Sequence, residues 1–174
     1  MGVAGCQRLM HETTATALAY GIFKVIKNQC SKDAPTNVMF VELGATSYFV
    51  SVTEFVPGKL IIRSSHYDPY PGGRDIDALI ADFLASKFKK KCKSQLSGKP
   101  MERHKTRIKL YSATKKAKKT LSPQGVNEAR VNLECLMDDL DFGVTFKNDD
   151  YEQMMKPFLA RLRAPIKRAL AVIP

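Results

Sequence analysis

The sequence predicts a mixed α/β fold in which a meander of three strands is combined with helices and a separate hairpin. Short apolar runs with turn residues between them fill residues 38–65, as expected for β-strands. Three later stretches repeat their apolar residues every three or four positions, as helices do. The 174 residues are 44% hydrophobic and 26% charged, which is enough apolar material for a packed core and argues against disorder.

The N-terminal half predicts one helix followed by three strands. The helix is expected over about 12–20, with Gly21 at its end, because glycine is the commonest residue just after a helix. The nearly continuous apolar run 38–43 predicts a central, buried strand. Stretches 48–55 and 59–65 predict a second and a third strand, joined by a Pro-Gly turn.

Two long helices are predicted next. The first begins at Asp75, and its apolar residues lie on one face: Ile76, Leu79, Ile80, Phe83, Leu84 and Phe88. A Gly and a Pro end this pattern near residue 98. The second helix is expected over 100–121, and the following residues are expected to point to the core: Ile108, Tyr111, Ala113, Ala117 and Leu121.

The last third of the chain predicts a hairpin and a final helix. Stretches 131–137 and 142–146 carry apolar residues of a strand pattern and flank Asp138-Asp139, a pair that favours a tight turn. The helix is expected to start near residue 148. Pro165 lies inside its pattern, and a kink is expected there because proline lacks the N–H that continues a helix.

Positive charge is concentrated in one segment. Fourteen of the 28 Lys and Arg residues lie between 86 and 119, where Glu102 is the single acid. Solvated helix faces explain this segment most simply, and a patch for an acidic partner or phosphate is the alternative. A nucleic-acid site is a weaker reading, because few aromatic residues are interleaved for stacking on bases. No apolar run approaches the roughly 20 residues of a membrane span, so no membrane partner is expected.

A turn of small residues, 44–47, separates the first two predicted strands. Such a turn can bring backbone N–H groups against a phosphate. Most turns of this composition are nevertheless only tight hairpins, so the turn alone is a weak signal for a phosphate site.

Five motifs, in this order, resemble a single family. They are HETTATALAYGIFK, NVMFVELGATSYFVSV, DPYPGGRDID, ATKKAKKTLS and ECLMDDLDF, and the resemblance covers about 4–171. Together they resemble lobe II of the actin-like, ribonuclease H-like ATPase domain of the heat-shock-seventy chaperones, most of all the large, hundred-and-ten-kilodalton branch. The resemblance implies an incomplete inner subdomain over 1–71 and 153–174, into which an outer α+β subdomain is inserted over 72–152.

The resemblance also implies a site for ATP or ADP with magnesium in a longer parent protein. Glu12 and Glu42 match positions at the catalytic centre, and Glu42 would contact magnesium through a bound water. The matches for nucleotide contacts are Gly44, Ala45, Thr46 and Ser47 in the phosphate turn, Gly72 and Gly73 at the subdomain hinge, and Lys115, Lys118, Lys119 and Ser122 around adenine and ribose.

Several of these positions depart from the family pattern. Glu42 replaces an Asp, which moves the carboxylate by one methylene, about 1.5 Å. Ala45 and Thr46 replace glycines where backbone should approach phosphate closely, and Lys115 replaces a ribose-binding Glu. Lobe I and the adenosine loop of lobe II are also missing from the sequence. The resemblance therefore implies a fragment that is no enzyme and binds no nucleotide by itself, with a parent that is at most a weak ATPase.

The function implied for the parent is that of a chaperone or co-chaperone in the cytoplasm. It would bind an ordinary heat-shock-seventy chaperone, accelerate its nucleotide exchange, and hold unfolded client proteins through other domains. An ATP-hydrolysing chaperone of the ordinary type is the first alternative, and a basic nucleic-acid-binding domain is the second, although no nucleic-acid partner is expected. The lumen of the endoplasmic reticulum is the alternative location.

Overall fold

The chain forms two compact units in the computed structural model, which describes residues 5, 8–26, 35–93 and 95–172. The first unit comprises Met1–Gly72 and Arg161–Pro174, and the second comprises Gly73–Ala160. The chain thus returns to the first unit after residue 160, later than the expected 152. The reason is that apolar residues in the first turns of the last helix, among them Met155 and Phe158, pack in the core of the second unit.

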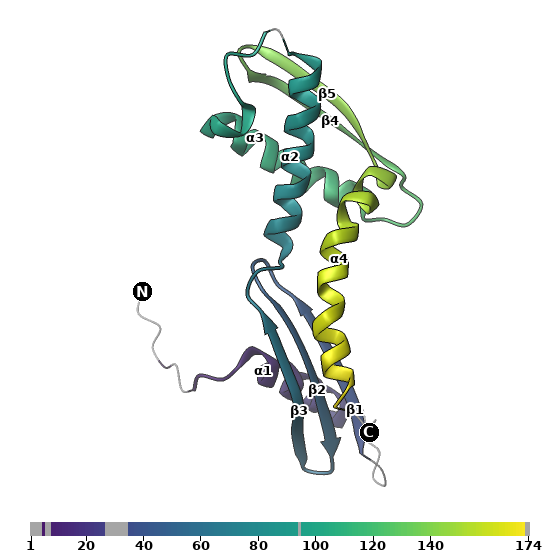
Figure 1. The fold of residues 1–174 in the computed structure, drawn as a ribbon. Coiled ribbons are helices and arrows are strands. Elements are labelled where there is room, and N and C mark those ends of the chain that lie inside the picture. Colours follow the sequence, from purple (N-terminus) through teal and green to yellow (C-terminus); the bar gives the residue numbers. More distant parts are fainter. Residues whose placement is uncertain (1–4, 6–7, 27–34, 94, 173–174) are drawn as a thin grey trace. The chain divides into compact units, whose positions relative to one another are not determined.

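The first unit contains a helix and an antiparallel meander. These are α1 (Glu12–Ile26), β1 (Thr36–Leu43), β2 (Tyr48–Val56) and β3 (Lys59–Asp68), with strand order β1-β2-β3 (Figure 1). The end of α4 (Asn148–Leu170) completes this unit from Arg161 onward. The predicted mixed α/β fold with a meander of three strands is confirmed.

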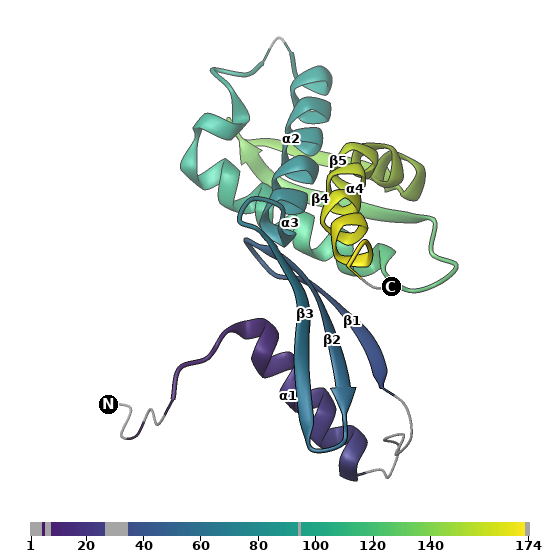
Figure 2. The ribbon, with the colours of Figure 1, turned by 60° about the horizontal axis from the view of Figure 1, so that its bottom comes forward.

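Both faces of the central strand β2 are covered. On one face Tyr48, Val50 and Val52 are almost fully buried and form a cluster with Ala169 of α4. On the other face α1 lies against the sheet (Figure 2), where the ring of Tyr20 lies 5.5 Å from the ring of Phe55, centroid to centroid. Burial of each large apolar side chain contributes about 1.5–3 kcal/mol to the stability of the fold. Packing of α1 and α4 on its two faces therefore stabilises the meander.

Two predictions for this unit are wrong. Helix α1 does not end at Gly21 but continues to Ile26. Gly21 serves packing instead, since a Cβ built there would lie 3.0 Å from Cε1 of Phe55. Strand β1 is not central: within the described ranges it pairs only with β2, and Met39, Val41 and Leu43 are 38–48% exposed. An apolar run thus did not distinguish an edge strand with one covered face from a buried one.

The second unit packs two helices on a hairpin. Its elements are α2 (Gly73–Lys91), the short 3-10 turn η1 (Pro100–Glu102), α3 (His104–Leu121), β4 (Glu128–Met137), β5 (Leu140–Lys147) and the first part of α4. The hairpin turn at Asp138-Asp139 is confirmed, and both residues have positive φ, at 53° and 57°. Arg103 separates η1 from α3, so the predicted helix over 100–121 begins only at His104.

Aromatic pairs build the core of the second unit. Phe88 of α2 and Phe142 of β5 meet edge to face with ring centroids 5.3 Å apart, and Phe83 meets Phe146 at 5.5 Å. Ile108 was expected in this core, but it is 55% exposed on α3. The buried stripe of α3 lies on the opposite side of the helix from Ile108 and comprises Thr106, Leu110, Ala113, Thr114, Ala117 and Leu121.

Helix α4 continues through Pro165, where a kink was predicted, up to Leu170. The C-terminal part of α4 packs against the sheet through Leu162, Ile166 and Ala169. No helix in the described ranges is long and apolar enough to cross a membrane.

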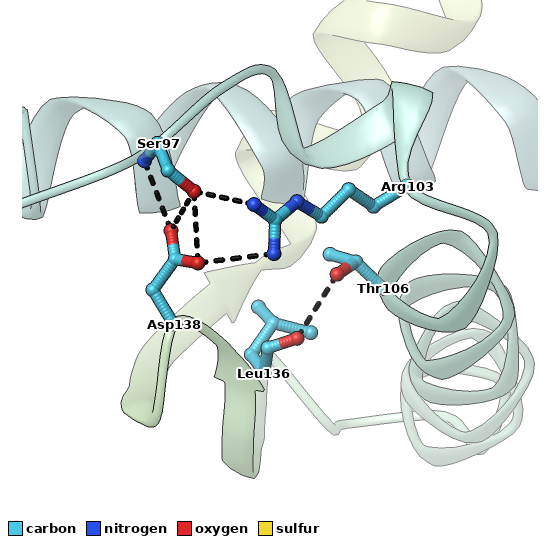
Figure 3. A network of polar contacts seen from close by, with 5 residues as sticks. All are labelled: Ser97, Arg103, Thr106, Leu136 and Asp138. Atoms are coloured by element: carbon cyan, nitrogen blue, oxygen red, sulfur yellow. Dashed lines mark hydrogen bonds and ion pairs between the residues drawn. The ribbon is translucent and has the colours of Figure 1, made fainter.

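A polar network joins the hairpin turn to the loop before α3 (Figure 3). The N–H and hydroxyl of Ser97 donate to the carboxylate of Asp138 at 2.9 and 2.8 Å, and Arg103 forms an ion pair with the same carboxylate at 3.0 Å. Nearby, the buried hydroxyl of Thr106 donates to the carbonyl of Leu136. The hydrogen bonds from Ser97, and then Arg103, hold the pKa of Asp138 below its usual value.

Acid should therefore weaken this network. A carboxyl group whose pKa is lowered by folding stabilises the folded state above its unfolded pKa, about 3.9, and this contribution is lost as the pH falls through the folded pKa. We expect Asp138→Asn to lower the urea midpoint at pH 7 and to flatten its decline below about pH 4. Asn tolerates the positive φ of this turn, so the backbone is preserved.

Asp139→Asn is the matched control, because Asp139 has the same backbone conformation and makes no polar contact with the described residues. Equal pH profiles for the two variants would show that the contacts of Asp138 do not contribute to stability.

Candidate functional site

The turn between β1 and β2 carries the residues of the predicted phosphate loop. The ladder of the two strands ends at the pair Leu43 and Tyr48, and the N–H of Gly44 donates to the carbonyl of Ser47 at 2.8 Å. The N–H groups of Ala45 and Thr46 find no acceptor among the residues that the structure describes. The turn therefore presents two exposed backbone donors, which is the kind of group that binds an anion.

Gly72 lies directly against this turn. A Cβ at Gly72 would be 2.5 Å from the carbonyl oxygen of Ala45 and 2.7 Å from Cα of Thr46. Both are backbone atoms, which cannot move aside without changing the turn. Two motifs that are distant in sequence, the phosphate turn and the first hinge glycine, are thus brought together, and only glycine fits between them.

The end of β3 is fixed to α4 next to Gly72. Arg161 donates to Asp68 through Nη2 at 2.9 Å and Nε at 3.1 Å, and its guanidinium lies 5.6 Å from the centroid of the Tyr70 ring. Desolvation alone would raise the pKa of Asp68, but the hydrogen bonds from Arg161 and from the N–H of Tyr70 outweigh it and lower the pKa. These contacts restrain the segment that carries Gly72 against the turn.

Glu42 stands two residues before the turn. Its Oε1 is buried and has no hydrogen-bond partner in the described part of the chain. A buried carboxylate oxygen without a donor is unfavourable, and a water bound to magnesium is a donor that would satisfy it. The chemistry of Glu42 therefore fits the outer contact to magnesium that the resemblance implies.

Glu12 makes no polar contact with this group among the described residues. It is the first residue of α1, and its side chain is exposed. The buried residue at this end of α1 is its neighbour, Thr13.

The remaining predicted site residues belong to the second unit. Gly73 begins α2, and Lys115, Lys118 and Lys119 lie in the last turns of α3. Ser122 follows as the C-cap of α3, and its N–H donates to the carbonyl of Lys119 at 3.4 Å. Lys115 and Lys119 are exposed.

Lys118 has a partner that the sequence did not indicate. Its Nζ lies 2.5 Å from Oδ1 of Asp77 on α2, and both side chains are largely covered. The pair joins α2 to α3, so Lys118 has a structural contact besides any role toward nucleotide. Asp77 was missed because only the packing of α2 on α3 gives it a partner.

Comparison with known proteins identifies the family. The model of the Hsp70 protein family matches residues 2–172. The chain belongs to the Hsp70 family. Human heat shock 70 kDa protein 4L is 37% identical over 170 residues, which are 97% of this chain and 20% of that protein. Heat shock 70 kDa protein 14 of Arabidopsis thaliana is also 37% identical, over 94% of this chain and 19% of its own length.

Heat shock protein hsp88 of Neurospora crassa is a third relative, 34% identical over 94% of this chain and 22% of that protein. The chain thus spans about a fifth of the length of these relatives. The predicted resemblance to the large branch and the predicted actin-like fold class are confirmed. The chain is an Hsp70-family domain of the kind found in large Hsp70-like proteins.

One prediction is corrected by this membership. The chain was expected to be no enzyme, but the Hsp70 family consists of ATPase chaperones, and these are enzymes. The expectation rested on the absence of lobe I from the sequence and, for the parent protein, on departures such as Glu42 and Lys115, but neither changes the class of the family.

Proposed function

We propose that, in the full-length protein, the β1–β2 turn holds the phosphates of ATP or ADP with magnesium, and that this protein promotes nucleotide exchange on an ordinary Hsp70 chaperone. The arrangement of Gly72 against the turn is the observation that carries the nucleotide part. It fixes the backbone of Ala45 and Thr46 while their N–H groups remain free to donate.

Each residue of the turn has a definite task in this proposal. The N–H groups of Ala45 and Thr46 donate to phosphate oxygens, and the hydroxyl of Ser47 supplies a further donor. The buried oxygen of Glu42 accepts a hydrogen bond from a water of the magnesium ion. Magnesium, when bound, screens the charge of the phosphates.

The nucleotide part is tested by titrating the full-length protein with a fluorescent ADP, with and without magnesium. We expect binding that depends on magnesium and that Glu42→Gln weakens about tenfold, since loss of one charge-assisted hydrogen bond costs about 1.5–3 kcal/mol. Glu128→Gln is the matched control, because Glu128 is exposed at the start of β4 in the second unit. Equal binding by all three proteins would rule out this role for Glu42.

The exchange part has its own test. Fluorescent ADP is loaded on an ordinary Hsp70 ATPase domain, and its release is followed after the full-length protein is added. We expect release to become faster as the concentration of the full-length protein rises into the micromolar range. An unchanged release rate would exclude an exchange factor, while leaving the proposed nucleotide site intact. We also propose that the full-length protein holds unfolded client proteins through its other domains and that it is located in the cytoplasm.

A further inference from the structure

The outward face of α3 carries a shallow groove that is widely open to solvent. Opposite the buried stripe of this helix, side chains at successive turns surround a space of about 350 Å³. The groove is lined by His104, Arg107, Ile108, Tyr111, Ser112 and Lys115. All six lie on one element of the second unit, so the groove does not depend on how the two units are placed.

Apolar surface lies at the middle of the groove. Ile108 is 55% exposed, although it was predicted to point to the core, and Tyr111 is half-buried. A single exposed isoleucine is ordinary on a protein surface. Here it shares the groove with an aromatic ring and has polar groups around it, and exposed apolar side chains with a polar rim are typical of a protein-interaction surface.

The charge of the groove has a single sign. His104, Arg107 and Lys115 line it, and no Asp or Glu does. Other cations of this region have protein partners: Arg103 pairs with Asp138, and Lys118 with Asp77. Arg107 and Lys115 pair with no acid in the described ranges. Their charges therefore remain free for an external carboxylate.

We infer that this groove binds a short acidic segment of another protein. The segment places one apolar side chain on Ile108 and Tyr111, and its carboxylates lie near Arg107 and Lys115. Because the groove is positively charged, charge complementarity favours a negatively charged partner segment. Burial of Ile108 against the partner's apolar side chain adds affinity that a purely ionic contact lacks.

Nucleic acid and small anions fit the groove less well. Proteins that bind single strands combine a cationic track with several stacking rings, whereas the groove has one ring, Tyr111. A free phosphate would use Arg107 or Lys115 but would leave Ile108 exposed. The isoleucine is thus the feature that favours a peptide.

The test uses the 174-residue chain and a fluorescein-labelled peptide of alternating Glu and Asp with one central Leu. Binding is followed by fluorescence anisotropy at physiological salt. We expect Ile108→Ala and Arg107→Ala each to weaken binding about tenfold, as truncation of an interface anchor does. The same peptide with Gly in place of Leu should lose a similar factor, and this loss should vanish in Ile108→Ala.

Matched controls separate the groove from general electrostatics. Lys116→Ala removes one positive charge from α3 outside the groove, and Leu159→Ala removes an exposed apolar side chain from α4. Both should bind the peptide as the unaltered chain does. Circular dichroism of each variant checks that α3 remains folded.

Three outcomes would overturn the inference. Equal losses in Arg107→Ala and Lys116→Ala would show non-specific attraction by the basic segment. Tighter binding of a single-stranded oligonucleotide, with sensitivity to Arg107→Ala, would make the groove a nucleic-acid site. Binding of ATP with magnesium that is weakened by Ile108→Ala, without any peptide binding, would make it part of the nucleotide site. The exchange assay above does not involve the peptide, so the two proposals fail independently.

Discussion

Replacing Phe88 by alanine is expected to destabilise the second unit by about 3–5 kcal/mol, the usual range for a buried phenylalanine. Phe88 is fully buried on α2, and its ring meets Phe142 of β5 edge to face. The substitution therefore removes apolar contacts and leaves a cavity between the helix and the hairpin. Most domains are stable by only about 5–15 kcal/mol, so a large part of the second unit's stability would be lost.

The measurement is a urea titration followed by circular dichroism, with amide hydrogen exchange to show which unit opens. Leu79→Ala is the matched control on the same helix, because Leu79 is 39% exposed and should lose less than about 1 kcal/mol. Similar losses for the two variants would contradict a core centred on Phe88. Loss of exchange protection in β1 and β2 before β4 and β5 would contradict the division into units.

Alanine at position 72 is expected to have the second large effect, on the first unit. Its Cβ would lie 2.5 Å from the carbonyl oxygen of Ala45, a distance at which the turn between β1 and β2 must shift. Overpacking of this kind costs about 1–3 kcal/mol, and more where backbone has to move. We expect Gly72→Ala to lower the unfolding midpoint of the first unit and to increase hydrogen exchange at residues 43–48.

Gly98→Ala is the control for Gly72→Ala. A Cβ at Gly98 would meet only Cε of Met137, at 3.9 Å, which is an ordinary contact. This variant makes the same chemical change without a clash. If Gly72→Ala is as stable as Gly98→Ala and the exchange of the turn is unchanged, Gly72 does not hold the turn.

The order of elements could be predicted from the sequence because local signals agree with one another. The hairpin turn at Asp138-Asp139 illustrates this, since its two residues tolerate positive φ and apolar strands flank them. Gly21 and Ile108 show two ways in which the prediction failed. Gly21 is glycine because a ring from β2 approaches the helix, a tertiary contact that spacing along the chain does not reveal. Ile108 was assigned to the core together with Ala117 and Leu121, although 3.6 residues per turn place it on the opposite side of α3, where it is exposed.

The candidate site, too, could be predicted from the sequence only in part. Composition and order marked the 44–47 turn, and the resemblance marked Gly72, but their contact is a tertiary fact. The partners of Lys118 and Arg161 were not foreseen, because Asp77 and Asp68 reach them only after the elements pack. Polar pairs between distant elements carry no periodic signal, whereas apolar stripes do.

The first unit is assembled from two segments that are far apart in the chain, and this affects when it folds. Its Tyr48, Val50 and Val52 are covered by Ala169, which is made more than a hundred residues later. The second unit is one continuous segment, so its contacts form across shorter loops and at a smaller entropic cost. During synthesis we therefore expect residues 73–160 to fold first and the meander to fold only after the end of α4 has emerged from the ribosome.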